Sequence, residues 1–271
     1  MIIGVPKEIK EQEYRVALLP SAAYQLIKRG HQVLVGRNAG TGSGYPDEDY
    51  QRAGATLVDD HAEIFEKAEL IVKVKEPQPS EYHLLRRGQI LFTYLHLAAS
   101  RSLTEALQGS GATCLAYETI EVNRRLPLLE PMSEIAGRMS VLVGGYFLAK
   151  HCHGTGVLLG GVPGTPPGRV TIIGAGNSGA HACRMAAGMG AQVTVLDVDS
   201  RKLDYLDSEY RGRVVTLVSN PANIERAVAD SDLLVGAVLT PGARAPVVVS
   251  KKMVRTMRAG SVIGDIAVDQ G

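Results

Sequence analysis

Four polar side chains occupy positions where they could bind a small acid and move a proton. Lys75 ends an expected strand at 70–75, and His96 follows another at 90–95. Arg15 lies in the loop after the first expected strand, and Asp269 follows the last one. Ligands of parallel α/β sheets bind beyond the carboxyl ends of the strands. A lysine there can hydrogen-bond a carbonyl or carboxylate oxygen, a histidine can exchange a proton near neutral pH, and an arginine can grip a carboxylate.

Each of these residues also fits a purely structural role when it is considered alone. Lys75 could be a solvated strand end and His96 an imidazole bonded to backbone. Arg15 could be a surface guanidinium, and Asp269 a carboxylate in a turn. The spacing alone leaves both interpretations open.

A glycine-rich segment between two apolar runs predicts a dinucleotide-binding site. Gly174, Gly176 and Gly179 follow the run 170–173 in the pattern G-x-G-x-x-G, and Asp197 ends the next run, 192–196. The glycines permit a tight turn, close approach of a pyrophosphate and close packing of the following helix, whose free amides attract phosphate. A carboxylate at the end of the second strand can bind a ribose diol and repels a 2′-phosphate, which favours NAD over NADP. The alternative is a structural glycine turn in another kind of α/β domain.

The elements that must position these residues alternate between strand and helix in both halves of the chain. The first half predicts strands at 2–5, 32–35, around Leu57, and at 70–75, 90–95 and 113–117, with helices between them. A long helix at 133–151, with Ser133 as its N-cap, is expected to join the halves. The second half predicts strands at 170–173, 192–196, 214–218, 233–237 and 261–266. Because a complete dinucleotide-binding sheet has six strands, this parallel sheet looks incomplete.

The chain is therefore expected to be an α/β protein of two domains, a substrate domain at 1–130 and a Rossmann-type domain at 131–271 that includes the linking helix. Its 271 residues carry a formal net charge of +1, without a basic patch, which argues against nucleic acid. Apolar runs are too short for a membrane helix, and the three scattered cysteines fit a reducing cytoplasm. No metal site is expected, because the cluster His151-Cys152-His153 has no distant partner at the usual spacing.

A series of motifs resembles bacterial alanine dehydrogenases from the first residue to the last. They are, in order, GVPKEIKEQEYRVAL, IVKVKEP, LFTYLHLA, PMSEIAGRM, GVLLGGVPG, IGAGNSG and DIAVDQG. The resemblance implies a reversible, NAD-dependent deamination of L-alanine to pyruvate and ammonia. It also implies that Arg15 and Lys75 bind the substrate carboxylate and carbonyl, that His96 is the acid–base residue, and that Asp269 positions and deprotonates ammonia or water.

The same resemblance assigns residues to the cofactor. It places Ser133, Asp197, Arg201, Ser219, Val238 and Leu239 at that site, with Lys202 beside Arg201 as an alternative partner. The expected set is completed by Gly174, Ala175, Gly176, Asn177, Ser178 and Gly179 in the glycine-rich loop, by Val198 beside Asp197, and by Ile266 and Asp269 at the last strand.

Family members continue well past the DQG motif, so this chain is expected to be a C-terminally truncated form with impaired activity. The family forms hexamers, and a smaller homo-oligomer such as a dimer is expected here. One alternative is a non-catalytic NAD(H)-binding or regulatory homologue. Another is the nucleotide-binding part of a transhydrogenase, against which His96 argues because the counterpart lacks that histidine. A saccharopine-type dehydrogenase matches the motifs less well.

Overall fold

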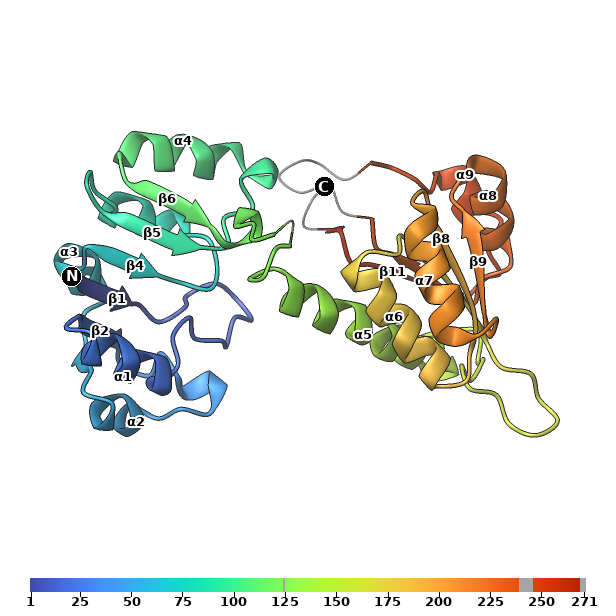
Figure 1. Cartoon of the computed structure of the whole chain (residues 1–271), viewed down its shortest axis with the longest axis horizontal. Helices are drawn as coiled ribbons and strands as arrows, with labels where there is room; N and C mark the ends of the chain where they lie inside the picture. Colours follow the sequence, from blue (N-terminus) through green and yellow to red (C-terminus); the bar gives the residue numbers. More distant parts are fainter. Residues whose placement is uncertain (124, 239–245, 269–271) are drawn as a thin grey trace. The chain divides into compact units, whose positions relative to one another are not determined.

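The chain forms two compact α/β units, residues 1–120 and 121–271 (Figure 1). The computed structural model describes residues 1–123, 125–238 and 246–268. Both units are built on parallel sheets, so the expected two-domain α/β fold is confirmed. No helix in these ranges is both long and apolar enough to cross a bilayer.

The first unit contains a six-stranded sheet whose strand order is β3-β2-β1-β4-β5-β6. All neighbouring strands are parallel. The order reverses between β1 and β4, and in open α/β sheets this switch point is where ligands bind. The strands are β1 (Ile2–Val5), β2 (Gln32–Gly36), β3 (Thr56–Val58), β4 (Leu70–Val72), β5 (Ile90–Thr93) and β6 (Thr113–Ala116).

Helices cover both faces of this sheet because its strand residues are apolar on both sides. One face packs Leu34, Ile71 and Leu91 against Phe65 of α3 (His61–Lys67) and against α4 (Arg101–Ser110). The other face packs β1 and β2 side chains against α1 (Pro20–Lys28) and α2 (Asp47–Arg52). The switch-point edge is therefore held between two apolar layers.

The second unit has five strands in the order β11-β10-β7-β8-β9, again all parallel. All five strands expected in this half are present, and the order reverses between β7 and β10. The strands are β7 (Arg169–Ile173), β8 (Gln192–Asp197), β9 (Val214–Val218), β10 (Leu233–Gly236) and β11 (Val262–Asp265). The helices are α5 (Glu130–Phe147), α6 (Asn177–Gly188), α7 (Ser200–Tyr210), α8 (Pro221–Ala229) and α9 (Lys251–Val254).

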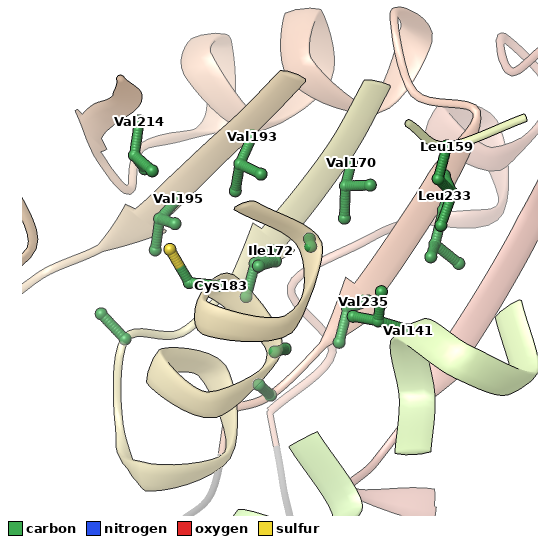
Figure 2. Close-up of a cluster of buried hydrophobic side chains, with 14 of the residues drawn as sticks. Val141, Leu159, Val170, Ile172, Cys183, Val193, Val195, Val214, Leu233 and Val235 are labelled. Atoms are coloured by element: carbon green, nitrogen blue, oxygen red, sulfur yellow. The ribbon is translucent and has the colours of Figure 1, made fainter. Parts of the chain in front are cut away.

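Successive side chains of each strand point to opposite faces of the sheet, so the second unit has two hydrophobic cores, one on each face. Figure 2 shows Val170, Ile172 and Val195 on the face that packs against Cys183 of α6 and Val141 of α5. Residues of opposite parity, including Ile173 of β7, pack against α8 on the other face. The glycine-rich turn after β7 is thus anchored on both sides of the sheet.

The long helix α5 differs from its expected limits. It begins at Glu130, with Leu129 as its N-cap, so Ser133 is not the cap. The Ser133 amide already donates to the Leu129 carbonyl oxygen at 3.0 Å, which is a helical bond. Pro131 explains the earlier start, because proline sets the backbone angle of a first helical turn and needs no amide partner there. The helix ends at Phe147, and residues Lys150–Cys152 form a separate 3₁₀ turn.

The strand expected at 70–75 is also shorter, since β4 ends at Val72. Lys73 is fully buried among charged partners rather than in an apolar layer. The Val74 and Lys75 amides donate to the Glu8 carboxylate, at 2.6 and 3.4 Å, instead of continuing a strand ladder. Lys75 therefore lies beyond the strand, in a loop, as does His96 after β5.

Candidate functional site

The glycine-rich turn of the second unit has a separate steric requirement at each glycine. Gly174 adopts φ +103°, and a Cβ there would lie 2.6 Å from the Ala237 carbonyl oxygen. A Cβ on Gly179 would lie only 1.7 Å from the Gly174 carbonyl oxygen, so the first turn of α6 packs directly on the loop. A Cβ on Gly176 would meet nothing within 4 Å. Because the protein does not need that space, Gly176 leaves room for a ligand.

A pocket of about 770 Å³ opens at this turn. Polar backbone and side-chain groups line it together with apolar ones, as is usual for cofactor sites. The residues expected at the cofactor that line it are Ser133, Gly174, Gly176, Asn177, Ser178, Asp197, Val198, Lys202, Ser219 and Val238.

Asp197 lines the pocket and also holds two neighbouring backbone segments of the pocket wall together. Its side chain is 7% exposed, and its carboxylate accepts hydrogen bonds from the Ala175 amide at 2.6 Å and the Asp199 amide at 2.8 Å. The Lys202 ammonium lies 3.6 Å from the same carboxylate. The acid at the end of β8 thus ties the glycine-rich turn to the start of α7.

Some expected cofactor residues lie away from the pocket lining. Arg201 forms a two-pronged pair with Asp199, at 2.9 and 3.1 Å, so Lys202 rather than Arg201 lines the pocket. Ala175 and Gly179 serve the turn itself, and the Ile266 amide extends the pairing of β11 by bonding Gly236. Leu239 and Asp269 lie outside the described residues.

Two charged residues of the pocket were not predicted from the sequence. Arg125 bonds Glu130 through two nitrogens, at 3.0 and 2.5 Å, and both residues line the pocket. Arg125 lowers the pKa of Glu130, and a hydrogen bond from Asn177 adds to this effect. The only local signal was a pair of opposite charges just before an expected helix. The other lining residues that were missed are Leu126, Leu129, Leu196, Ala237, Pro246 and Val248.

These features fit a dinucleotide. The amino end of the twelve-residue helix α6 faces the pocket, where free amides and the helix dipole favour a phosphate. Gly176 provides the space for close approach, and Val198, 81% exposed beside Asp197, offers an apolar surface to a base. The residues present therefore match the group that the glycine spacing predicts.

In the first unit, the expected residues Arg15, Lys75 and His96 follow the neighbouring strands β1, β4 and β5. Arg15 follows β1 and bonds Glu13 through Nε and Nη2, at 2.8 and 2.6 Å. Burial acts to raise the pKa of Glu13, but bonds from Arg15 and the charge of Lys75 outweigh it and lower that pKa. Glu13 is thus paired with Arg15 and lies within the electrostatic reach of Lys75, and it is a site residue that the sequence did not single out.

His96 faces a second carboxylate that was not predicted. Its Nδ1 lies 3.5 Å from Oε2 of Glu76, and Glu76 also pairs with Lys10. Burial acts to raise the pKa of Glu76, but these two partners hold that pKa at about 2. The His96 ring stacks beside Tyr94 with centroids 6.1 Å apart. An ionised Glu76 beside Nδ1 orients the imidazole and leaves Nε2 for proton exchange.

A buried ionic network lies beneath the loop that carries Lys75. The Lys73 ammonium lies 3.2 Å from Oε2 of Glu8 and 3.0 Å from Oε1 of Glu81. His61 lies 2.9 Å from Oε1 of Glu81, which completes the network. Burial raises the pKa of Glu8, whereas His61 and Lys73 overcome burial and lower the pKa of Glu81. Unpaired charges here would be costly, so the network fixes this segment in one conformation.

Comparisons with known proteins agree with this arrangement. Family models for the N-terminal and C-terminal domains of alanine dehydrogenase/PNT match residues 4–136 and 140–271. An alanine dehydrogenase of Bacillus subtilis (strain 168) is 53% identical over 271 residues, which are 100% of this chain and 71% of the relative.

Solved structures give the same result. An L-alanine dehydrogenase is similar at a TM-score of 0.92 and 54% identity, with 100% of this chain and 75% of that chain covered. A transhydrogenase from Sinorhizobium meliloti is similar at a TM-score of 0.84 and only 26% identity, with 100% and 80% covered. The family models cover nearly the whole chain, and identity to the alanine dehydrogenases is about twice that to the transhydrogenase. The chain therefore belongs to the alanine dehydrogenase/PNT family, on its alanine dehydrogenase side.

Proposed function

We propose that the protein is an NAD-dependent alanine dehydrogenase. In this reaction L-alanine, water and NAD⁺ become pyruvate, ammonium, NADH and a proton. The observation that carries the proposal is that Arg15, Lys75 and His96 follow the three neighbouring strands β1, β4 and β5, in a chain 53% identical to an alanine dehydrogenase. The glycine-rich pocket of the second unit supplies the nucleotide site.

Arg15 and Lys75 bind the small acid in this proposal. The guanidinium of Arg15, held by Glu13, presents a planar set of donors suited to a carboxylate. Lys75 bonds the carbonyl oxygen of pyruvate and stabilises negative charge as it develops there. A guanidinium and an ammonium group together favour a 2-oxo or 2-amino acid, which has a carboxylate, over an analogue without one.

His96 moves the proton. In the deamination direction, alanine is first oxidised to an imine, and water then adds to the imine carbon. With Nδ1 directed at the Glu76 carboxylate, Nε2 of His96 can remove a proton from that water. In the reverse direction the same nitrogen returns the proton to the departing oxygen. Asp269 is proposed to assist by positioning ammonia or water.

NAD supplies the hydride acceptor, at the nicotinamide ring, when it is bound. Asp197 is proposed to accept a hydrogen bond from a ribose hydroxyl, in addition to the two that it accepts from backbone amides. Ser133, Ser219 and Val238, which line the pocket, are proposed to contact the cofactor. The family resemblance adds Leu239, which lies outside the described residues. Because a carboxylate at this position repels a 2′-phosphate, the proposal specifies NAD over NADP.

We also propose a cytoplasmic homo-oligomer, a dimer or the hexamer of the family. Three free cysteines fit a reducing compartment. Helix α5 exposes an apolar stripe of the kind that subunit contacts cover. Its members are Ile135, Met139, Leu142, Val143, Tyr146 and Phe147, which are 43 to 59% exposed. Light scattering coupled to gel filtration should give a mass above that of the 28.9 kDa monomer.

Two measurements on the purified chain test the activity. NADH binding is titrated by fluorescence, and NADH oxidation is followed with pyruvate and ammonium. Binding together with turnover supports the proposal. Binding without turnover would instead identify a non-catalytic nucleotide-binding homologue, and the absence of binding would remove the cofactor assignment itself.

A further inference from the structure

Glu118 lies where β6 ends, and its carboxylate reaches the loop after the neighbouring strand β5. Its Oε1 accepts hydrogen bonds from the Leu95 amide at 3.0 Å and the His96 amide at 2.7 Å, and its Oε2 lies 3.2 Å from the Leu95 amide. Hydrogen bonds to an ionised acceptor are shorter and stronger than neutral ones. A single half-buried side chain thus holds two consecutive amides that the strand ladder no longer pairs.

The backbone of His96 needs such support. Its angles, φ 50° and ψ 39°, lie in the left-handed region, which is uncommon outside glycine, although histidine, asparagine and aspartate adopt it more often than other residues. Strained backbone of this kind persists only where surrounding contacts determine it. The direction of the imidazole from the backbone is different in a left-handed conformation and in an extended one. Because Glu118 holds this backbone conformation, it also determines where the ring lies.

The first unit uses the same device once more. Glu8 follows β1, and its carboxylate holds the Val74 and Lys75 amides beyond β4. In the strand order β1 flanks β4 and β6 flanks β5. The loops after β1 and β6, the strands on either side of the pair β4 and β5, therefore each contribute a carboxylate that holds the segment after the neighbouring strand. These two segments carry Lys75 and His96. Because the same arrangement occurs at both segments, we interpret the Glu118 contact as one that positions a site residue, and not as an incidental surface hydrogen bond.

We propose that Glu118 is a positioning residue that holds His96 in its left-handed, proton-transferring orientation. This inference rests on the proposed function for its kinetic consequence, but the contact itself can be observed separately. Glu118 acts through the His96 backbone, whereas Glu76 contacts the imidazole, so the two carboxylates have different roles.

The kinetic test compares the wild-type chain with Glu118→Ala, Glu118→Gln and the control Glu121→Gln, which changes an exposed carboxylate nearby. We expect kcat for pyruvate amination to fall about 10- to 100-fold in Glu118→Ala, the size of a small displacement of a reacting group. Glu118→Gln should lose less, because its Oε1 can still accept from both amides. KM for pyruvate should change little, since Arg15 and Lys75 keep their own partners, and the control should match wild type.

The contact is read out by NMR of protein labelled with ¹⁵N-histidine, in which the His96 amide is identified among seven histidines by its loss in His96→Gln. Its proton resonance should lie downfield in the wild type and move upfield in both Glu118 variants but not in the control. If Glu118→Ala does not fold, the kcat and the His96 amide resonance of Glu118→Gln are used to test the proposal. A folded variant with unchanged kcat, or an unmoved His96 amide, would overturn the proposal. If the wild type has no turnover, the proposed function fails, and the amide resonance alone decides whether Glu118 holds His96.

Discussion

The nucleotide pocket of the second unit and the substrate edge of the first unit are formed by different kinds of groups. The pocket is shaped mainly by backbone, with Gly174, Gly176 and Gly179 permitting a turn that side chains would block. The substrate edge, formed by Arg15, Lys75 and His96, consists of polar side chains: Arg15 pairs with Glu13 in its own loop, and His96 lies 3.5 Å from Glu76 of another loop. A phosphate needs amides and space, whereas a small 2-oxo acid needs charged groups held at defined positions.

Both sites nevertheless use the same topological position. The strand order reverses between β1 and β4 in one unit and between β7 and β10 in the other. Loops after the two strands at a switch point diverge to opposite faces of the sheet and leave room between them. The fold provides the location twice, and local chemistry decides what each location binds.

The largest expected effect follows from removing the side chains of the first unit that are proposed to react. His96→Ala and Lys75→Ala should each lower kcat/KM for pyruvate by about 10² to 10⁴-fold, because proton transfer or charge stabilisation is lost. NADH affinity should stay unchanged, since the pocket residues belong to the second unit. Steady-state kinetics with a binding titration checks both statements, and Lys252→Ala, at an exposed lysine, is the control. Wild-type rates in both variants would show that the site is assigned wrongly.

The glycine-rich turn offers a contrast between stability and binding. Gly179→Ala places a methyl group 1.7 Å from the Gly174 carbonyl oxygen, so we expect the free energy of unfolding to fall by about 3 kcal/mol. Gly176→Ala meets no protein atom, and its stability should stay within about 1 kcal/mol of wild type. NADH binding by Gly176→Ala should nevertheless weaken about tenfold, because the methyl group occupies the ligand's space.

Thermal unfolding and a fluorescence titration separate the two outcomes. Equal NADH affinity in wild type and Gly176→Ala would mean that the ligand lies elsewhere.

The ion pairs of the substrate edge should appear in the pH dependence of stability. The pKa of Glu76 is lowered from 4.5 to about 2 in the folded protein, so its contribution is complete above pH 4.5 and is lost as the pH falls toward 2. We expect Glu76→Gln to be about 2 kcal/mol less stable at pH 7 and to lose less stability over that acid range. Urea unfolding at a series of pH values measures both. Parallel curves for wild type and variant would contradict the assignment.

The smallest expected effect concerns cofactor choice. Because the Asp197 carboxylate lines the pocket, NADPH should bind at least about tenfold more weakly than NADH, a difference of about 1.4 kcal/mol. Titrating the two nucleotides against the same protein sample gives the ratio. Equal dissociation constants would reject this role for Asp197.

The sequence predicted the nucleotide pocket more completely than the substrate edge. Glycine spacing, the flanking apolar runs and Asp197 all lie within one short segment, and ten of the expected residues line the pocket. The start of α5 was predicted wrongly at Ser133, because a good capping residue competed with Pro131, which favours an earlier first turn. Arg125 and Glu130 carried no motif that would reveal them.

By itself the sequence determined the alternation of strands and helices, the glycine turn and the residues that could react, since these depend on neighbours along the chain. Only the tertiary structure decided the strand order, and with it that Glu8 reaches Lys75, that Glu118 reaches His96 and that Glu76 meets the imidazole. Burial in the fold removes competing water from these carboxylates and makes each partner matter, and strand pairing between distant segments is what brings them together.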